Sequence, residues 1–408
     1  MPENPVPSRR LAESRPLLVA LPLALALAVP AAGGTASLWN GRVRFGGELS
    51  ATIAPDDEGY FNYSDYSTSQ LRLLRADLSV ELRLAPFASL LGELRSDNLS
   101  RPRVYALYLR LTPRPGRPFD LQAGLVPPVF GAYPRRRYAY DNPLPSVPLA
   151  YQYFTTLRYD ALPSRAEDVL GQRGRGWLVH YPIGDPASAP GLPLVDAARW
   201  DTGVQARLGV EPWSLSLALT QGSPSRPLVR DDNGGKQVSA RLQWKPGPAL
   251  TAGISGASAE FVSRAAASAL PAAARGHFLQ RAAGLDLEWS SGYWILRGEA
   301  VYCRWALPAV LATRIERPLE ALGAYAEARY KVRPGLYAAA RVDRLGFGEI
   351  DSSLGRETWD APVTRVEAGA GYAPLRHLLL KVSWQHNRRD GGRVRSNDLV
   401  AAQALLWF

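Results

Sequence analysis

The last ten residues of the chain constrain its fold more than any other stretch. They run from Leu399 to Phe408. Side chains on a β-strand alternate between two faces. If these residues form a strand, one face holds only apolar side chains: Val400, Ala402, Ala404, Leu406 and Phe408. The end of a soluble chain rarely forms such a strand, because terminal residues usually fray in water. The C-terminus therefore predicts a strand whose apolar face meets something other than water.

The same alternation recurs along the chain from Asn40 onward, in stretches of about ten residues. In the clearest stretch, even positions from Leu74 to Leu84 are apolar, and odd positions from Arg75 to Arg83 are charged or polar. A single such segment is weak, but repetition makes the pattern convincing. The predicted strands are 41–53, 70–84, 88–97, 103–112, 118–126, 200–210, 212–221, 236–245, 249–259, 279–289, 293–304, 319–331, 335–345, 362–372, 376–387 and 397–408.

The connections between these strands alternate strictly between short turns and longer loops, as in outer-membrane barrels. Aromatic residues gather beside the short turns, as they do where lipid meets water: Phe87, Trp213, Trp244, Trp289, Tyr330, Tyr372 and Phe408. The pattern predicts an all-β, antiparallel transmembrane β-barrel of about sixteen strands in a bacterial outer membrane. An even strand number places both termini on the periplasmic side. A soluble β-sandwich would not need so many strands of membrane-spanning length.

The N-terminus has the pattern of a secretory signal peptide. Arg9, Arg10 and Arg15 precede an apolar run from Pro16 to Ala32, and small residues follow. We expect residues 1–36 to be the signal, with cleavage between 31 and 36, and residues 37–408 to form the barrel. The alternative is an uncleaved anchor helix.

Composition excludes several classes of function. Cys303 is the sole cysteine, so an exported chain has no disulfide framework or thiolate metal cluster. The formal charge of +11 comes almost wholly from Arg, and export argues against nucleic acid as a partner. The four histidines show no metal-ligand spacing, and catalytic motifs are absent, so we expect neither a cofactor nor an enzyme. An outer-membrane hydrolase using His386 near Asp390 is the remaining catalytic alternative.

The connection 127–199 differs from the other loops. It spans 73 residues and contains eleven prolines, and a long segment without regular structure is usually functional. Two basic groups stand out in it: Arg135, Arg136 and Arg137, and then Arg173 and Arg175. We expect the segment to fold into the barrel, where these groups would form a basic constriction. Alternatives are a surface cap, a subunit contact or a short strand at 177–181.

Basic residues on the polar strand faces are candidate pore-lining groups. They are Arg75, Arg83, Arg110, Arg207, Arg241, Arg297, Arg329, Arg341, Arg365 and Lys381. Acidic residues on the same faces are nearly as numerous, and many would pair across neighbouring strands. The balance predicts at most a weak preference for anions.

Several stretches resemble the family of phosphate-selective porins O and P. They are the strand 71–78, the strand and turn 121–131, and the pair 201–205 and 216–222. The resemblance implies a sixteen-stranded homotrimeric porin with an inward-folded third loop. It does not extend to the lysine-rich phosphate site of the family, because this chain has only four lysines.

The sequence thus predicts an outer-membrane porin, a passive diffusion channel for small hydrophilic or ionic solutes. Its expected partners are outer-membrane lipid and lipopolysaccharide, and the barrel-assembly machinery, which would recognise Phe408. The alternative from a different class is a structural or conduit barrel that sheathes or anchors a partner protein.

Overall fold

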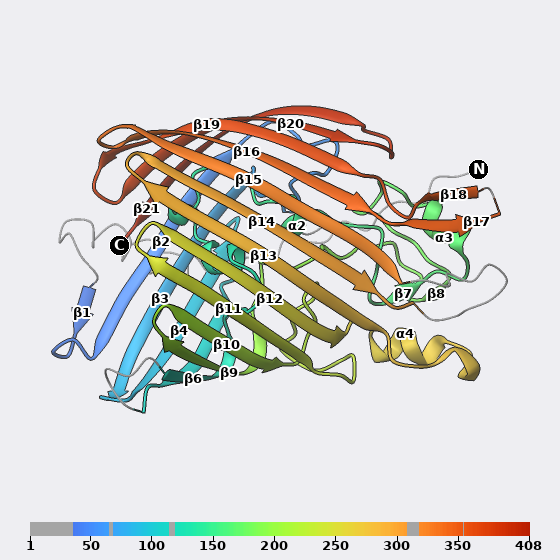
Figure 1. The fold of residues 1–408 in the computed structure, drawn as a ribbon, viewed down its shortest axis with the longest axis horizontal. Helices are drawn as coiled ribbons and strands as arrows, with labels where there is room; N and C mark the ends of the chain where they lie inside the picture. The colour runs from blue at the N-terminus through green and yellow to red at the C-terminus, as the bar shows by residue number, and fades with distance from the viewer. Residues whose placement is uncertain (1–35, 65–67, 114–118, 308–317, 354) are drawn as a thin grey trace.

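A computed structural model describes residues 36–408 except 65–67, 114–118, 308–317 and 354. Of the predicted signal peptide, residues 1–36, only Ala36 is among the described residues. The main sheet has seventeen strands. One of them, β1 (Ala36–Leu38), only extends the sheet beside β2, and the other sixteen form a closed antiparallel barrel (Figure 1). No helix among the described residues is long and apolar enough to cross a membrane.

The wall strands follow one another around the barrel in sequence order. They are β2 (Val43–Ile53), β3 (Leu73–Ala85), β4 (Ala88–Asp97), β5 (Arg103–Leu111), β6 (Phe119–Val126), β9 (Asp201–Val210), β10 (Trp213–Thr220), β11 (Gln237–Gly247), β12 (Leu250–Glu260), β13 (Leu279–Ser291), β14 (Trp294–Trp305), β15 (Leu319–Arg333), β16 (Leu336–Phe347), β19 (Val363–Leu375), β20 (Leu378–Arg389) and β21 (Ser396–Trp407).

The barrel closes through the C-terminal strand. β21 pairs antiparallel with β2, and the register runs from Glu48 opposite Trp407 to Ile53 opposite Ala402. The backbone of Phe408 also exchanges two hydrogen bonds with Gly47. The predicted fold class is therefore confirmed, and each of the sixteen predicted strands is present with bounds shifted by at most three residues, as at 70 against Leu73.

The connections alternate as predicted. Short turns join β3 to β4, β9 to β10 and the corresponding pairs onward, all at the end of the barrel where the chain terminates (Figure 1). The opposite end carries the long connections, including α4 (Arg264–Ala269), η4 (Ala272–Ala274) and the hairpin of β17 (Glu349–Ser352) with β18 (Gly355–Thr358).

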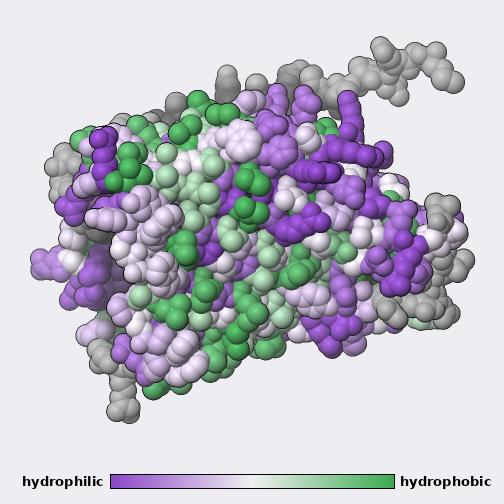
Figure 2. Space-filling view, turned by 45° about the horizontal axis from the view of Figure 1, so that its top comes forward, coloured by the Kyte–Doolittle hydropathy of each residue, from purple (hydrophilic) through white to green (hydrophobic). Residues whose placement is uncertain are grey.

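The two faces of the wall differ as the alternation requires. On β20 the apolar Leu380, Val382 and Trp384 are between 42% and 50% exposed, whereas the intervening Lys381 and Ser383 are at most 4% exposed. A closed sheet has one inner and one outer face, so the apolar face is the outer one. Figure 2 shows hydrophobic side chains over the middle of the wall and hydrophilic ones gathered toward the end with the long connections.

The 127–199 segment contains only short elements. These are η2 (Tyr133–Arg136), η3 (Ala139–Asp141), α2 (Leu149–Gln152), α3 (Ala166–Leu170), and the two-residue strands β7 (Ala161–Leu162) and β8 (Ile183–Gly184), which pair with each other. The considered strand at 177–181 is absent, since Val179 forms only an isolated bridge with Ala189. The frequent prolines explain this, because each removes a ladder donor.

Candidate pore lumen

Polar and charged side chains line the buried face of the wall. Carboxylates occur on it at four separated positions that also contact the 127–199 segment: Glu48 on β2, Glu93 on β4, Glu299 on β14 and Glu367 on β19. Buried carboxylates need hydrogen-bond donors or opposite charges to offset the loss of hydration. The 127–199 segment supplies those donors.

Three consecutive arginines of this segment reach three different parts of the wall. Arg135 donates to Ser216 of β10 over 3.3 Å. Arg136 pairs with Glu288 of β13 at 3.0 Å and donates to the Tyr325 hydroxyl of β15. Arg137 pairs with Glu93 of β4 at 2.6 Å. The compact 3₁₀ turn η2 makes this possible, because successive side chains point about 120° apart.

Aromatic rings hold the Arg137 guanidinium in place. Its central carbon lies 3.7 Å from the ring centre of Tyr105 on β5 and 4.3 Å from that of Tyr138. Arg95 of β4 also stacks on Tyr105, at 3.8 Å, and pairs with Asp77. Stacking on π-faces stabilises a desolvated cation. Arg137 keeps two N–H groups, Nε and Nη1, without a partner among the described residues.

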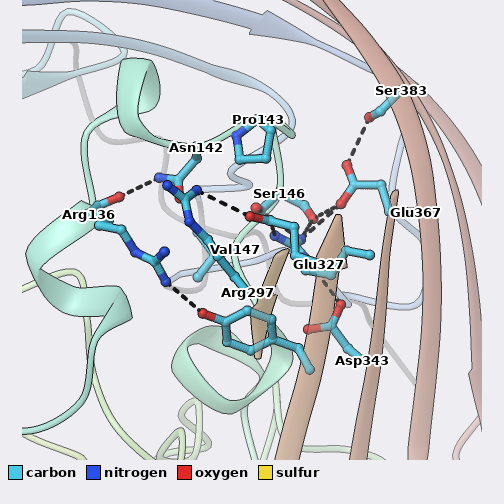
Figure 3. A network of polar contacts seen from close by, with 12 residues as sticks. Arg136, Asn142, Pro143, Ser146, Val147, Arg297, Glu327, Asp343, Glu367 and Ser383 are labelled. Carbon is cyan, nitrogen blue, oxygen red and sulfur yellow. Dashed lines mark hydrogen bonds and ion pairs between the residues drawn. The ribbon is translucent and has the colours of Figure 1, made fainter. Parts of the chain in front are cut away.

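A second contact region joins the segment to β15, β16 and β19, and Figure 3 shows it. Arg341 is fully buried and pairs with Glu367 at 2.9 Å and with Asp343 at 3.0 Å. Its guanidinium also donates to the carbonyl of Ser146, over 3.1 Å, and the Ser146 hydroxyl donates to Glu367. Charge pairing in the wall and attachment of the segment are thus parts of one network.

Two further wall cations bind the backbone of the segment. Lys381 donates to the carbonyls of Ala139 and Asn142 at 2.6 and 2.7 Å. Arg365 donates to the carbonyl of Val147 at 2.9 Å. A cation with several carbonyl acceptors satisfies groups that would otherwise be buried without partners.

Asp360, in the connection before β19, fixes the segment at two points. Its carboxylate accepts from the backbone N–H groups of Thr156, at 2.9 Å, and of Gly174, at 2.8 Å. Burial raises the pKa of Asp360 from 3.8 to about 6, and these N–H donors and Arg389 oppose that rise. The desolvation of a carboxylate therefore outweighs the stabilising hydrogen bonds here.

A cavity of about 380 Å³ remains between the segment and the wall on the side of β2, β3 and β4. Its charged lining comprises Arg75, Arg95, Arg137, Arg199 and Arg226 with Glu48, Asp160 and Asp196. The uncharged amides Gln152 and Gln403 also line it, and each has an oxygen without a partner among the described residues. A cavity of this volume, with charged and amide groups set among apolar side chains, suits small molecules.

The two predicted basic groups of the segment do not meet. Arg173 forms an ion pair with Glu357 of β18, at the end with the long connections, and Arg175 is exposed nearby in sequence. Of the five arginines predicted in this segment, only Arg135, Arg136 and Arg137 contact strands of the barrel wall.

The predicted wall residues divide into two kinds. Arg241, Arg297, Arg341, Arg365 and Lys381 are largely buried and hydrogen-bonded, and Arg75 pairs with Asp97 at 2.7 Å. The others retain contact with water or stack on a ring: Arg83, Arg110, Arg207 and Arg329. Arg110, for example, pairs with Asp120 at 3.1 Å, and its side chain is 45% exposed.

Sequence reasoning placed Glu48, Glu93, Glu299 and Glu367 on the inner strand faces, but it did not single out Asp360, an acceptor outside the wall strands. No local motif marks such an aspartate, because its partners are backbone N–H groups more than 180 residues away. Cys303 is a buried free thiol on β14.

His386 lies on the outer face of β20. Its Nδ1 lies 3.0 Å from Asp398, and its ring stacks on Trp384. The expected acidic neighbour was Asp390, so that expectation was wrong. The cross-strand register explains the difference, since β20 and β21 place His386 directly opposite Asp398.

Comparisons with known proteins identify the fold. No family model matches this chain, and no curated protein matches it. OmpF of Salmonella typhi, solved in complex with daunomycin, is 10% identical and aligns over 91% of this chain and 100% of its own, with a TM-score of 0.55. The outer-membrane channel DcaP of Acinetobacter baumannii is 13% identical over the same shares, with a TM-score of 0.54.

The trimer form of OmpT, an outer-membrane protein of Vibrio cholerae, is 10% identical over 90% of this chain and 99% of its own, with a TM-score of 0.50. The chain has the porin fold. This fold and the apolar outer face agree with the predicted location in a bacterial outer membrane. The narrower resemblance to porins O and P rests on the stretches quoted above alone.

Proposed function

We propose that this porin-fold chain is a passive diffusion channel for small hydrophilic or ionic solutes in the outer membrane, and not an enzyme. One observation carries the proposal: a closed sixteen-stranded wall has a polar inner face and leaves a cavity of about 380 Å³ beside it, with eight charged side chains in its lining. Solutes bind only weakly in the parts of such a lumen that remain open, so they can enter and leave.

In this proposal the 127–199 segment lies in the lumen and narrows it. Its support is the position of its partners, since Glu93 of β4 and Glu299 of β14 belong to the buried face of strands on opposite sides of the barrel. A cap on the rim would not reach the midpoints of strands so far apart around the wall.

The charge of the cavity lining supports a weak preference for anions. Five arginines face three carboxylates there. Of the five, Arg199 has the most loosely paired guanidinium, since its side chain is 54% exposed and lies 3.8 Å from Asp196, which suits transient contact with an anionic solute. The remaining arginines have acidic partners, such as Asp77 for Arg95 and Asp232 for Arg226, so the preference remains small.

We further propose a homotrimer, because one protein with the same fold is known in a trimer form. The signal sequence at 1–36 and recognition of Phe408 by the assembly machinery belong to the same proposal. The extensive burial of the inner face near β16 and β19 favours a second candidate, a structural barrel that anchors a partner protein.

Single-channel recording of the refolded mature protein in a planar bilayer tests the main proposal. We expect stepwise ohmic conductance, and under a KCl gradient a reversal potential that indicates a slight excess of chloride permeation. Arg199→Gln should move that potential toward cation permeation, while the control Arg333→Gln, at the exposed rim, should leave it unchanged. A folded, heat-modifiable barrel without conductance steps would reject the channel and favour the structural role.

A further inference from the structure

Four arginines project from the outer face of the wall, where apolar side chains otherwise predominate. The strand alternation fixes their direction. On β13, for example, Arg281 is exposed together with Leu285 and Leu287, whereas Gln280 and Ala282 on either side of Arg281 are buried. The four are Arg281 on β13, Arg304 on β14, Arg344 on β16 and Arg388 on β20.

Arg281 and Arg304 share one level of the barrel. Arg281 is eight residues from Trp289, and Arg304 is ten residues from Trp294 along their strands (289 − 281 and 304 − 294). Both tryptophans lie at the short-turn end. At about 3.4 Å per residue and a tilt of about 40°, these separations correspond to roughly 20 to 26 Å across the membrane.

The apolar band of such barrels is about 25 Å tall. The arginines therefore stand at the membrane interface opposite the tryptophans, on the side of the long connections. Figure 2 agrees, because hydrophilic side chains gather at that end, beyond the hydrophobic middle of the wall.

Pairing with other described residues does not explain the arrangement of these charges. Arg281 is directly opposite Arg304 in the register of β13 and β14, and like charges at such positions repel. Among the described residues, neither of them forms an ion pair, and the same holds for Arg388. Arg344 donates only to the Thr364 hydroxyl.

Acidic side chains on this outer surface are fewer and already have partners. Glu320 is opposite Arg304 in register, but it hydrogen-bonds the Tyr302 hydroxyl. Asp398 contacts His386 at 3.0 Å. The surface thus retains an excess of unpaired guanidinium groups at the membrane interface.

We propose that Arg281 and Arg304 bind the phosphate groups of lipid A, the anionic lipid anchor of lipopolysaccharide in the outer leaflet. Arg344 and Arg388 extend the basic surface, two and four strands beyond β14. Directly opposed residues have Cα atoms about 5 Å apart, so two guanidinium groups can share one phosphate through bidentate hydrogen bonds. The neighbouring apolar side chains Ala283 and Leu285 would contact acyl chains. This site rests on the proposed outer-membrane location but not on channel activity.

Binding of lipid A to the full-length mature barrel, refolded in detergent, tests the site. The probe is diphosphorylated lipid A, and the readout is its dissociation constant from native mass spectrometry or from the shift in thermal unfolding midpoint. The double variant R281Q/R304Q should bind about tenfold more weakly or worse. The control R333Q/R376Q removes two exposed charges from the opposite rim and should bind within about twofold of wild type.

Two further probes separate the source of the phosphate. Lipid A from which both phosphates have been removed should bind wild type about as weakly as diphosphorylated lipid A binds the double variant. Inorganic phosphate at the same concentration should neither stabilise the barrel nor compete. Equal binding of diphosphorylated lipid A to wild type and to the double variant would overturn the site, and effective competition by inorganic phosphate would overturn the lipid as its ligand.

Conductance measured on the same samples separates this inference from the proposed function. The four arginines face away from the lumen, so the double variant should conduct as wild type does. A barrel that binds lipid A through Arg281 and Arg304 but does not conduct would reject the channel and retain the lipid site.

Discussion

Charged side chains on the inner face have different surroundings on two sides of the barrel. On the side of β16 and β19, Arg341 and Glu367 have no exposed side-chain surface and are tied to the 127–199 segment. On the side of β5 and β6, the side chain of Arg110 is 45% exposed and its partner Asp120 belongs to the wall. Residue types alone do not distinguish the two sides, because each carries arginines and carboxylates on its inner face.

The difference shows that the same wall chemistry can have two roles. Where the segment covers the wall, the charges hold structure together in a dry environment. Where it does not, they remain in water and can influence a passing ion. We therefore expect substitutions on the covered side to change stability, and those on the uncovered side to change selectivity.

The largest effect should come from Arg341→Ala. The substitution leaves Glu367 and Asp343 buried without their main cationic partner and removes a donor from the Ser146 carbonyl. Breaking a buried ion pair typically costs about 3–5 kcal/mol. We expect a loss of that order in the free energy of unfolding, measured by urea titration of the barrel in lipid vesicles.

The matched control is Arg110→Ala, which removes the same charge from the uncovered side. Its pair is half in water, and such pairs contribute about 0–1 kcal/mol. If both variants lost the same stability, the distinction between the two sides would be wrong.

A smaller effect should follow pH through Asp360. Its pKa rises from 3.8 to about 6 on folding, so the native state favours the protonated form. The corresponding stabilisation is fully present below pH 3.8 and is lost as the pH rises through 6. Its upper limit is about 3 kcal/mol, from two pKa units at 1.36 kcal/mol each.

Asp360→Asn removes this titration while keeping the shape of the side chain and the oxygen that can accept from Gly174. Thermal unfolding midpoints in micelles from pH 4.5 to 7.5 measure the effect. The midpoint of wild type relative to the variant should fall as the pH rises. Parallel curves for the two proteins would show that Asp360 does not titrate in this range.

The wall was predictable from the sequence, and the attachment of the segment was not. Alternation such as that from Leu74 to Leu84 is local, and it places the sixteen strands because lipid enforces a period of two on every one of them. The partners of Arg135, Arg136 and Arg137 lie 44 to 189 positions away in sequence. No periodicity constrains such contacts. The sequence therefore identified the arginines but not the groups that each of them contacts.

The smallest effect concerns ion selectivity on the uncovered side. Arg110 and Arg207 both have exposed side chains on the inner face. Among the described residues, Arg207 has only the Ser214 hydroxyl within hydrogen-bonding distance. In water, a unit charge about 8 Å from a permeating ion contributes about 0.5 kcal/mol, equivalent to roughly a twofold change in local concentration. R110Q/R207Q should therefore lower the chloride-to-potassium permeability ratio about two- to fourfold, measured from the reversal potential under a KCl gradient.

Arg365→Gln removes a buried charge that binds the Val147 carbonyl, and it should leave this ratio unchanged in channels that fold. An equal shift in both variants would mean that ions also pass along the covered side, and that the segment does not divide the lumen.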